Sequence, residues 1–264
     1  MTTSCGYYLA SRGPVYWVGL VNTLIGTVLV ASGTATLNQW MERVWDGQMR
    51  RTAKRPLPAG RLSAREALVF GISLSLAGGL YLALVVNKLA ATLAVSTLLS
   101  YLFIYTPLKR KTPLCTFLGA FPGAMPTLIG WAGASSVIDS RAWFLFGVLF
   151  LWQFPHFLAI ALMYREDYQR AGFRMLPAFD TDGRFTRAEI AGFSLLLVGT
   201  TLFTGLYAGL GALIALSVAG VLLLHPVLSL VKGRSRGMAS RVVHASIIYL
   251  PIVLFVDTIN KRYP

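Results

Sequence analysis

The sequence predicts an all-α polytopic membrane protein with eight membrane-spanning helices, and three features indicate this fold class. Hydrophobic residues make up 55% of the 264 residues. Charged residues make up 13%, about half of their usual share in a soluble domain. Apolar runs of about 20 residues, the length that crosses a bilayer as a helix, recur along the chain. They lie at about 14–40, 64–86, 89–107, 114–134, 142–163, 188–208, 210–231 and 242–258.

These runs occupy almost the whole chain, so we expect a single transmembrane domain over residues 1–264 without a separate soluble domain. The segment before the first run lacks the basic start and short apolar core of a signal peptide. The two cysteines, Cys5 and Cys115, are far apart and belong to no metal-binding motif, so neither a disulfide framework nor a zinc site is predicted.

The basic residues predict the orientation in the membrane. Of the 24 Lys and Arg residues, 19 lie in the loops after the first, third, fifth and seventh runs. By the positive-inside rule these loops face the cytoplasm, and both termini face outward. The net charge of +14 therefore reflects topology, and no nucleic-acid partner is expected. We place the active-site loops on this cytoplasmic side, at about 41–63, 108–113 and 164–187.

Acidic residues gather on the same side, and three polar residues there follow one another at intervals of four. Asn38, Glu42 and Asp46 end the first run, and on a helix they share one face within about 80° of rotation. Carboxylates at a membrane boundary are costly unless they are paired or bound to a cation. Two carboxylates and an amide oxygen suit Mg²⁺ that carries substrate phosphate oxygens. A salt-bridge network at the helix end is the alternative interpretation.

A basic stretch follows these acids directly, and Pro56 disfavours helix at the residue before it. Arg51 and Arg55 carry guanidinium groups that can fork onto phosphate oxygens, while Lys54 adds a point charge. Metal-binding acids beside phosphate-binding bases are typical of a diphosphate site. Anchoring to lipid headgroups is an alternative role for the arginines, and it is compatible with phosphate binding.

The fifth run carries polar residues at a depth where they are normally turned into the bundle. His156 and Asp167 are eleven residues apart, so in a continuous helix they would face within about 20° of each other, about 16 Å apart along the axis. Gln153 lies near the same face. This pattern predicts a polar stripe from the phosphate end to an apolar chamber. A buried histidine that bonds a neighbouring carbonyl is the alternative explanation of His156.

Four segments carry a resemblance to a known family. Residues Asn38–Pro58 resemble the first aspartate-rich motif of the UbiA family of intramembrane prenyltransferases. Three further segments resemble its protoheme IX farnesyltransferase (heme O synthase) branch: Tyr105–Pro113, Trp152–Phe157 and Asp167–Pro177. The resemblance extends over about residues 20–260. It implies a UbiA-like helical bundle in a bacterial inner membrane.

The resemblance also implies a reaction and its participants. A farnesyl group would pass from farnesyl diphosphate to a vinyl group of heme b, water would add, and heme O would form for a heme-copper oxidase. The implied partners beyond these substrates are membrane lipid, heme A synthase and terminal oxidase assembly proteins. Mg²⁺ would be held by Asn38, Glu42, Asp46 and Asp167. Diphosphate would be bound by Arg51, Lys54, Arg55, Lys109 and Arg110, and the heme acceptor by Trp152, Gln153 and His156.

The sequence departs from the family pattern at two points. The family has nine membrane helices and its first polar motif ends the second, so the first helix is expected to be missing here. Many relatives have a second aspartate four residues before the position of Asp167, where this chain has Met163. Two other functions remain open: prenyl transfer to an aromatic quinone precursor, and a non-enzymatic role as a transporter or heme-delivery protein.

Overall fold

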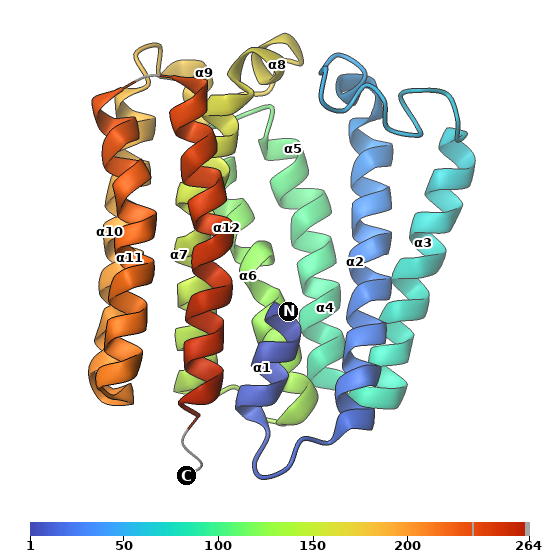
Figure 1. Cartoon of the computed structure of the whole chain (residues 1–264). Coiled ribbons are helices and arrows are strands. Elements are labelled where there is room, and N and C mark those ends of the chain that lie inside the picture. Colours follow the sequence, from blue (N-terminus) through green and yellow to red (C-terminus); the bar gives the residue numbers. More distant parts are fainter. Residues whose placement is uncertain (234, 262–264) are drawn as a thin grey trace.

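The computed structural model describes residues 1–233 and 235–261, and within them it forms helices without strands (Figure 1). Arg234 and Arg262, which count toward the predicted loop charges, lie outside these residues. The long helices are α2 (Trp17–Asp46), α3 (Ala64–Tyr81), α4 (Lys88–Leu99), α6 (Cys115–Ala134), α7 (Ser140–Met163), α10 (Arg184–Ala208), α11 (Leu210–Lys232) and α12 (Arg236–Ile259). The short ones are α1 (Thr2–Ala10), α5 (Thr106–Leu108), α8 (Arg165–Arg170) and α9 (Leu176–Phe179).

Each predicted membrane span coincides with a helix, but one of the eight differs in character. In the described part of the chain, seven helical stretches are long and apolar enough to cross a membrane. The fourth predicted span forms α6, which is rich in glycine and proline and has ten of its 20 residues buried. It lies between other helices, whereas outward-facing side chains such as Leu84 and Val221 remain more than 60% exposed. Such surfaces suit contact with lipid tails.

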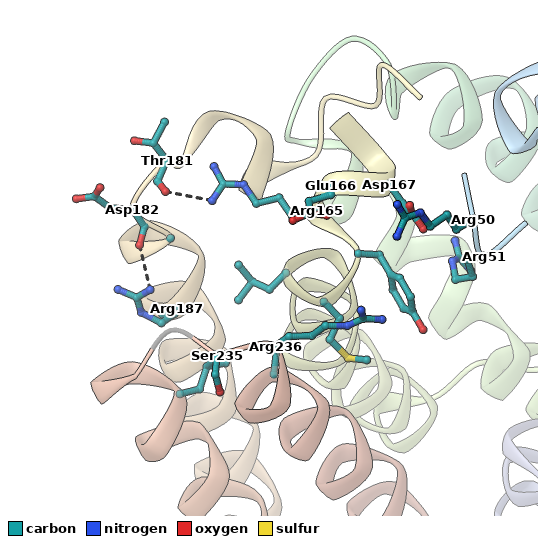
Figure 2. Close-up of a pocket in the computed structure, with 16 residues that line it drawn as sticks. Arg50, Arg51, Arg165, Glu166, Asp167, Thr181, Asp182, Arg187, Ser235 and Arg236 are labelled. Carbon is teal, nitrogen blue, oxygen red and sulfur yellow. Dashed lines mark hydrogen bonds between the residues drawn. The ribbon is translucent and has the colours of Figure 1, made fainter. Parts of the chain in front are cut away.

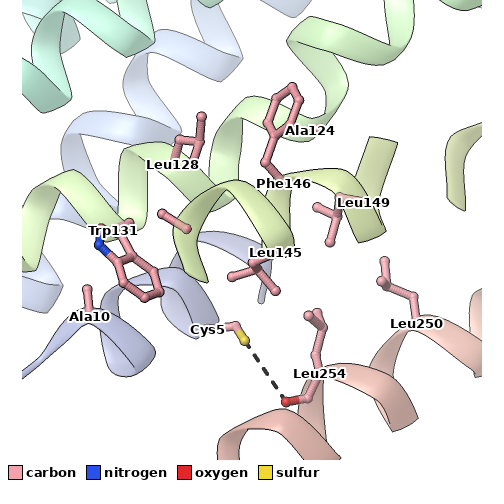
Figure 3. Close-up of a cluster of buried hydrophobic side chains, with 11 residues drawn as sticks. Cys5, Ala10, Ala124, Leu128, Trp131, Leu145, Phe146, Leu149, Leu250 and Leu254 are labelled. Atoms are coloured by element: carbon pink, nitrogen blue, oxygen red, sulfur yellow. Dashed lines mark hydrogen bonds between the residues drawn. The ribbon is translucent and has the colours of Figure 1, made fainter. Parts of the chain in front are cut away.

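A short helix precedes the first predicted span, where the sequence predicted none. Helix α1 packs closely on α6, because a Cβ added at Gly6 or at Gly130 would strike the backbone of the facing helix. Cys5 and Ala10 join a buried apolar cluster built from α6, α7 and α12 (Figure 3). The comparison with the family pattern predicted that the helix before α2 would be missing. The structure has the nine-residue helix α1 at that position.

The loops predicted to be cytoplasmic all lie at one end of the bundle, together with α8 and α9 (upper end in Figure 1). The loop after α2 folds back on itself, since Thr52 Oγ1 donates to the Asp46 carbonyl over 2.8 Å. It ends in a capping box, in which Ser63 Oγ accepts from the Glu66 amide and the Glu66 carboxylate accepts from the Ser63 amide. This polar end therefore collects residues that are distant in sequence.

Helix α7 stops at Met163, and this corrects one step of the sequence analysis. Tyr164 has φ −111° and ψ 26°, and α8 starts one residue later. The prediction that His156 and Asp167 share one helix face required a continuous helix, which the chain does not form at Tyr164. The apolar run ends at this point, and the charged segment that follows forms a separate short helix at the polar end.

Candidate active site

The last turns of α2 bury three polar side chains on one face. Asn38, Glu42 and Asp46 are 8%, 5% and 1% exposed. Asn38 Nδ2 donates to Glu42 Oε2 over 3.0 Å, as the spacing of four residues allows. Buried carboxylates require compensating partners, because transferring a charge out of water is costly.

Each of the two carboxylates is compensated by a base from another segment. Lys109 Nζ lies 3.0 Å from Glu42 Oε1 and 3.2 Å from Oε2. Arg55 Nη1 lies 2.7 Å from Asp46 Oδ2. Burial alone would lower the pKa of Lys109, but the oxygens of Tyr105 and Glu42 outweigh burial and raise this pKa above its ordinary value. The structure thus brings together two predicted metal ligands and two predicted phosphate-binding bases.

Thr106 positions the side-chain amide of Asn38, and the sequence did not single out this threonine. Its Oγ1 lies 2.8 Å from Asn38 Oδ1 and 2.9 Å from the Tyr101 carbonyl, so one hydroxyl proton serves two acceptors. Residues Ser100–Tyr105 form a π-helical turn, a distortion that often occurs at functional sites. The signal was present, since Thr106 belongs to the segment that resembles the farnesyltransferase branch.

The remaining predicted diphosphate-binding residues surround these pairs at the surface. Arg51 Nη2 donates to the Tyr168 hydroxyl over 3.2 Å. The Arg110 guanidinium lies 4.0 Å from the centre of the Trp45 ring. Lys54 is exposed, and its side chain makes no hydrogen bond or ion pair among the described residues. Arg51 and Arg110 are therefore positioned by aromatic neighbours, and Lys54 is not.

Asp167 occupies a separate position on α8. It is 8% exposed, and Arg170 Nη1 lies 3.3 Å from its Oδ1. Among the described residues, no three His, Cys, Asp or Glu side chains lie close enough to hold a metal ion by themselves. The residues around Asp167 nevertheless join the end of α2, because one buried cluster contains Met49 and Phe173 with the Tyr168 ring packed against it.

These acids can still serve a metal that arrives with its substrate. Mg²⁺ commonly takes one or two protein carboxylates and completes its shell with phosphate oxygens and water. Glu42 and Asp46 supply two carboxylates one helical turn apart, and the adjacent bases supply charge for a polyphosphate. The donor set therefore fits a metal–diphosphate complex better than an isolated metal ion.

The three predicted acceptor residues on α7 contact two different helices, α12 and α6. Trp152 Nε1 donates to the Ser246 carbonyl over 2.7 Å, and His156 Nδ1 lies 2.8 Å from Ser246 Oγ. The two rings stack with their centres 4.6 Å apart. Gln153 is turned the other way, and its Nε2 donates to the Ala120 carbonyl on α6. Trp152 and His156 therefore both bond Ser246 on α12, whereas Gln153 bonds α6.

An apolar cavity of about 280 Å³ lies between α2, α4 and α6, directly below the acids. Thr34, one turn before Asn38, lines it, as does Tyr101, whose carbonyl faces Thr106. The other lining residues are mainly aliphatic. A chain of isoprene size and chemistry fits such a space, with its polar head at the end of α2.

Comparisons with known proteins point to one family. The sequence model of the UbiA prenyltransferase family matches residues 1–248. Protoheme IX farnesyltransferase of Solibacter usitatus (strain Ellin6076) is 44% identical over 264 residues, which cover 96% of this chain and 90% of the relative.

Two solved structures have similar folds at low sequence identity. One, from work on digeranylgeranylglyceryl phosphate synthase, has a TM-score of 0.79 at 20% identity and covers 98% of this chain and 91% of its own. The other is a UbiA homolog from Archaeoglobus fulgidus bound to GPP and Mg2+, with a TM-score of 0.65 at 16% identity. It covers 97% of this chain and 93% of its own.

Proposed function

Because the chain belongs to the UbiA prenyltransferase family, we propose that it transfers the farnesyl group of farnesyl diphosphate to a vinyl group of heme b, with addition of water, to give heme O. The relative of 44% identity, named protoheme IX farnesyltransferase, supports this donor and acceptor because the two chains match over nearly their full lengths. The observation that carries the proposal is the buried set of acids and bases at the end of α2.

In this proposal the diphosphate binds above the end of α2, with Mg²⁺ held by Asn38, Glu42, Asp46 and Asp167. A solved family member bound to GPP and Mg2+ supports the use of this metal. When bound, Mg²⁺ supplies positive charge that stabilises the departing diphosphate. Lys109 and Arg55 now neutralise Glu42 and Asp46, and on binding they reorient toward phosphate oxygens.

The other predicted bases complete the charge balance around the leaving group. Arg51 and Arg110 lie at the rim, and Lys54 is exposed and unconstrained. As the allylic C–O bond breaks, diphosphate leaves with the electron pair, and negative charge grows on its oxygens. Once the cations contact the bound diphosphate, they stabilise that change without further reorganisation during bond breaking, which is an efficient way to lower a barrier.

The carbon chemistry takes place beneath the diphosphate. The vinyl π electrons of heme b form a C–C bond to the farnesyl C1, which leaves a cation on the carbon attached to the macrocycle. Water adds to that carbon and releases a proton, giving the hydroxyethylfarnesyl group. The Tyr101 and Tyr105 rings lie beside Lys109, so aromatic faces are available near the developing allyl cation.

The hydrophobic parts of both substrates require separate contacts. We assign the farnesyl chain to the apolar cavity of about 280 Å³ below Asn38. Trp152 and His156 present a stacked pair of rings that suits a flat macrocycle, while Gln153 donates to the Ala120 carbonyl on α6. These three residues remain our candidates for the acceptor side.

The protein is a polytopic membrane protein, and we propose the bacterial inner membrane as its location. Its active-site loops, at about 41–63, 108–113 and 164–187 of one domain over residues 1–264, would then face the cytoplasm. Clustering of these basic loops at one end of the bundle supports this orientation. The product would pass to heme A synthase or to terminal oxidase assembly proteins.

The acceptor can be tested directly in membranes that contain the full chain. Farnesyl diphosphate is supplied with heme b or with 4-hydroxybenzoate, and products are identified by mass spectrometry. We expect a farnesylated, hydrated heme and no prenylated benzoate. The reverse result would assign the chain to quinone precursors. A transporter or heme-delivery protein would retain its function after Glu42→Gln, whereas the proposed enzyme would lose it.

A further inference from the structure

A charged cavity of about 560 Å³ adjoins the diphosphate site, with which it shares Arg51 and Asp167, and lies between α7, α8, α10 and α12 (Figure 2). Two of its three carboxylates are already paired with arginines outside the lining: Asp167 with Arg170, and Asp182 with Arg184. The five arginines of the lining therefore carry more positive charge than the carboxylates of the lining neutralise. The charged residues of the lining are Arg50, Arg51, Arg165, Arg187, Arg236, Glu166, Asp167 and Asp182.

Arg187 is the most informative of these residues because it is buried and charged. It is 8% exposed, and its Nη1 donates to the Asp182 carbonyl over 3.0 Å. Among the described residues, no carboxylate oxygen lies within 4.0 Å of its guanidinium. Asp180 is the nearby acid, but its Oδ2 accepts from the Thr186 amide and hydroxyl. A buried guanidinium that bonds a carbonyl but no carboxylate favours binding of an anion.

Two more arginines border the same cavity and also lack carboxylate partners. Arg165 Nη1 donates to the Thr181 carbonyl over 3.1 Å. The Arg236 guanidinium lies 5.4 Å from the centre of the Tyr164 ring, whose other neighbour, Arg51, lies at 5.3 Å. Tyr164 thus lies between two arginines of the lining, and one of them, Arg51, is also assigned to the diphosphate. Positive charge is distributed across the cavity, which suits two separate anionic groups better than one compact group.

The cavity also has an apolar floor, so its ligand is amphiphilic. Leu162, Met163, Leu230 and Ala239 contribute this floor. His156 lies seven residues before Met163 on α7, two helical turns deeper in the bundle. Ser246, which bonds His156, lies seven residues after Ala239 on α12. The floor therefore leads toward the stacked rings of Trp152 and His156.

We propose that this cavity binds the two carboxylate groups of the heme acceptor, with Arg187 and Arg236 as their principal partners. The inference rests on the proposed function and names the place of one substrate. Heme b carries its two propionates on the edge opposite its vinyl groups. Anchoring the propionates at the polar surface directs the vinyl edge into the bundle, where the prenyl chain is bound. The apolar floor then contacts the macrocycle.

The test measures heme binding to the purified full chain by the shift in heme absorbance. Heme b is compared with its dimethyl ester, in which both carboxylates are neutral. We expect Arg187→Gln to weaken heme b binding about tenfold or more, the usual loss for a hydrogen bond to a charged group. Binding of the ester should change little. Arg241→Gln, on α12 but exposed and outside the cavity lining, should leave both affinities unchanged.

Further variants keep the inference testable if loss of a buried arginine unfolds the protein. Arg187→Lys retains the charge and should recover part of the affinity for heme b. Arg236→Gln changes an exposed side chain and should weaken heme b selectively. Equal losses for heme b and its ester, or no loss for either, would overturn the inference.

Three outcomes separate this inference from its premise and from phosphate binding. If the wild-type chain makes farnesylated heme but heme binding ignores Arg187→Gln, only the inference fails. If no farnesylated heme forms, the proposed function fails whatever binds here. If Arg187→Gln instead weakens competition by inorganic pyrophosphate or by vesicles of phosphatidylglycerol, the cavity is a phosphate or lipid headgroup site, and the heme inference is wrong.

Discussion

The two charged regions at the polar end of the bundle compensate their charges in opposite ways. At the end of α2, Glu42 and Asp46 each pair with a base within 3.0 Å. In the cavity between α7, α10 and α12, Arg165 and Arg187 donate to backbone carbonyls instead. The first region is therefore balanced without a ligand, whereas the second has an excess of positive charge.

This difference indicates how each region would respond to substrate. A metal–diphosphate complex brings both signs of charge, so the α2 site can exchange its internal ion pairs for pairs with the ligand. A dicarboxylate brings negative charge alone, so it completes the arginine cavity without displacing an internal partner. Changes at the α2 site should accordingly affect catalysis, and changes in the cavity should affect acceptor binding.

Removal of divalent cations is expected to give the largest difference between the responses of the two regions. With EDTA, farnesyl transfer should fall to background, and added Mg²⁺ should restore it, because the leaving group loses its main source of positive charge. Heme b binding, measured by absorbance, should stay unchanged. Full transfer in EDTA would contradict the proposed metal–diphosphate site.

Asp46→Asn should lower kcat by about 100- to 1,000-fold, the usual loss when a preorganised electrostatic contact is removed. Part of that loss could arise from Arg55, which is left without its partner in this variant. The double variant Asp46→Asn/Arg55→Gln removes both charges. Recovery of activity in the double variant would mean that the pair is structural, whereas we expect none.

His156→Gln should have a smaller effect and tests whether His156 contacts the heme acceptor. Loss of the stacked ring should raise KM for heme b by up to about tenfold, with little change in KM for farnesyl diphosphate. Steady-state kinetics with each substrate varied in turn provides the measurement. An equal rise in both KM values would move His156 out of the acceptor side.

Asp180→Asn should have the smallest effect and tests the support of the arginine cavity. Burial raises the pKa of Asp180, but hydrogen bonds from the Thr186 amide and hydroxyl outweigh burial and lower this pKa overall. Above the unfolded-state pKa of about 4, the charged carboxylate of Asp180 therefore stabilises the fold. This stabilisation is lost as the pH falls through the lower folded-state pKa. We expect a loss of about 1 kcal/mol at pH 7.

Thermal unfolding in detergent measures that loss. The difference between wild type and Asp180→Asn should shrink as the pH falls through the pKa of Asp180. A constant difference across this range would show that the carboxylate charge is not responsible.

Much of the bundle could be predicted because membrane spans depend on local composition. The four-residue spacing of Asn38, Glu42 and Asp46 also predicted their shared face, since one helix carries all three. The span at about 114–134 was predicted as well, and it forms the interior helix α6, whose glycines and prolines lie within the bundle. Helix α1 was missed because nine residues fall below the length of a span.

The remainder of the site depends on contacts between distant segments, which a single sequence does not reveal. Thr106 meets Asn38 across 68 residues, and the arginine cavity draws on helices from α7 to α12. The break at Tyr164 separated Asp167 from the stripe predicted along α7, because helix periodicity gives no warning of where a helix ends. Sequence reasoning therefore found the acids but missed the cavity beside them.

The most direct test of the central claim is mass spectrometry of heme from bacterial cells that have no heme-farnesylating enzyme of their own. Cells are given either the wild-type chain or Asp46→Asn, and immunoblots of the membranes confirm equal amounts. We predict heme bearing a hydroxyethylfarnesyl group with the wild-type chain and only heme b with the variant. Unmodified heme in both, or the same farnesylated heme in both, would contradict the account.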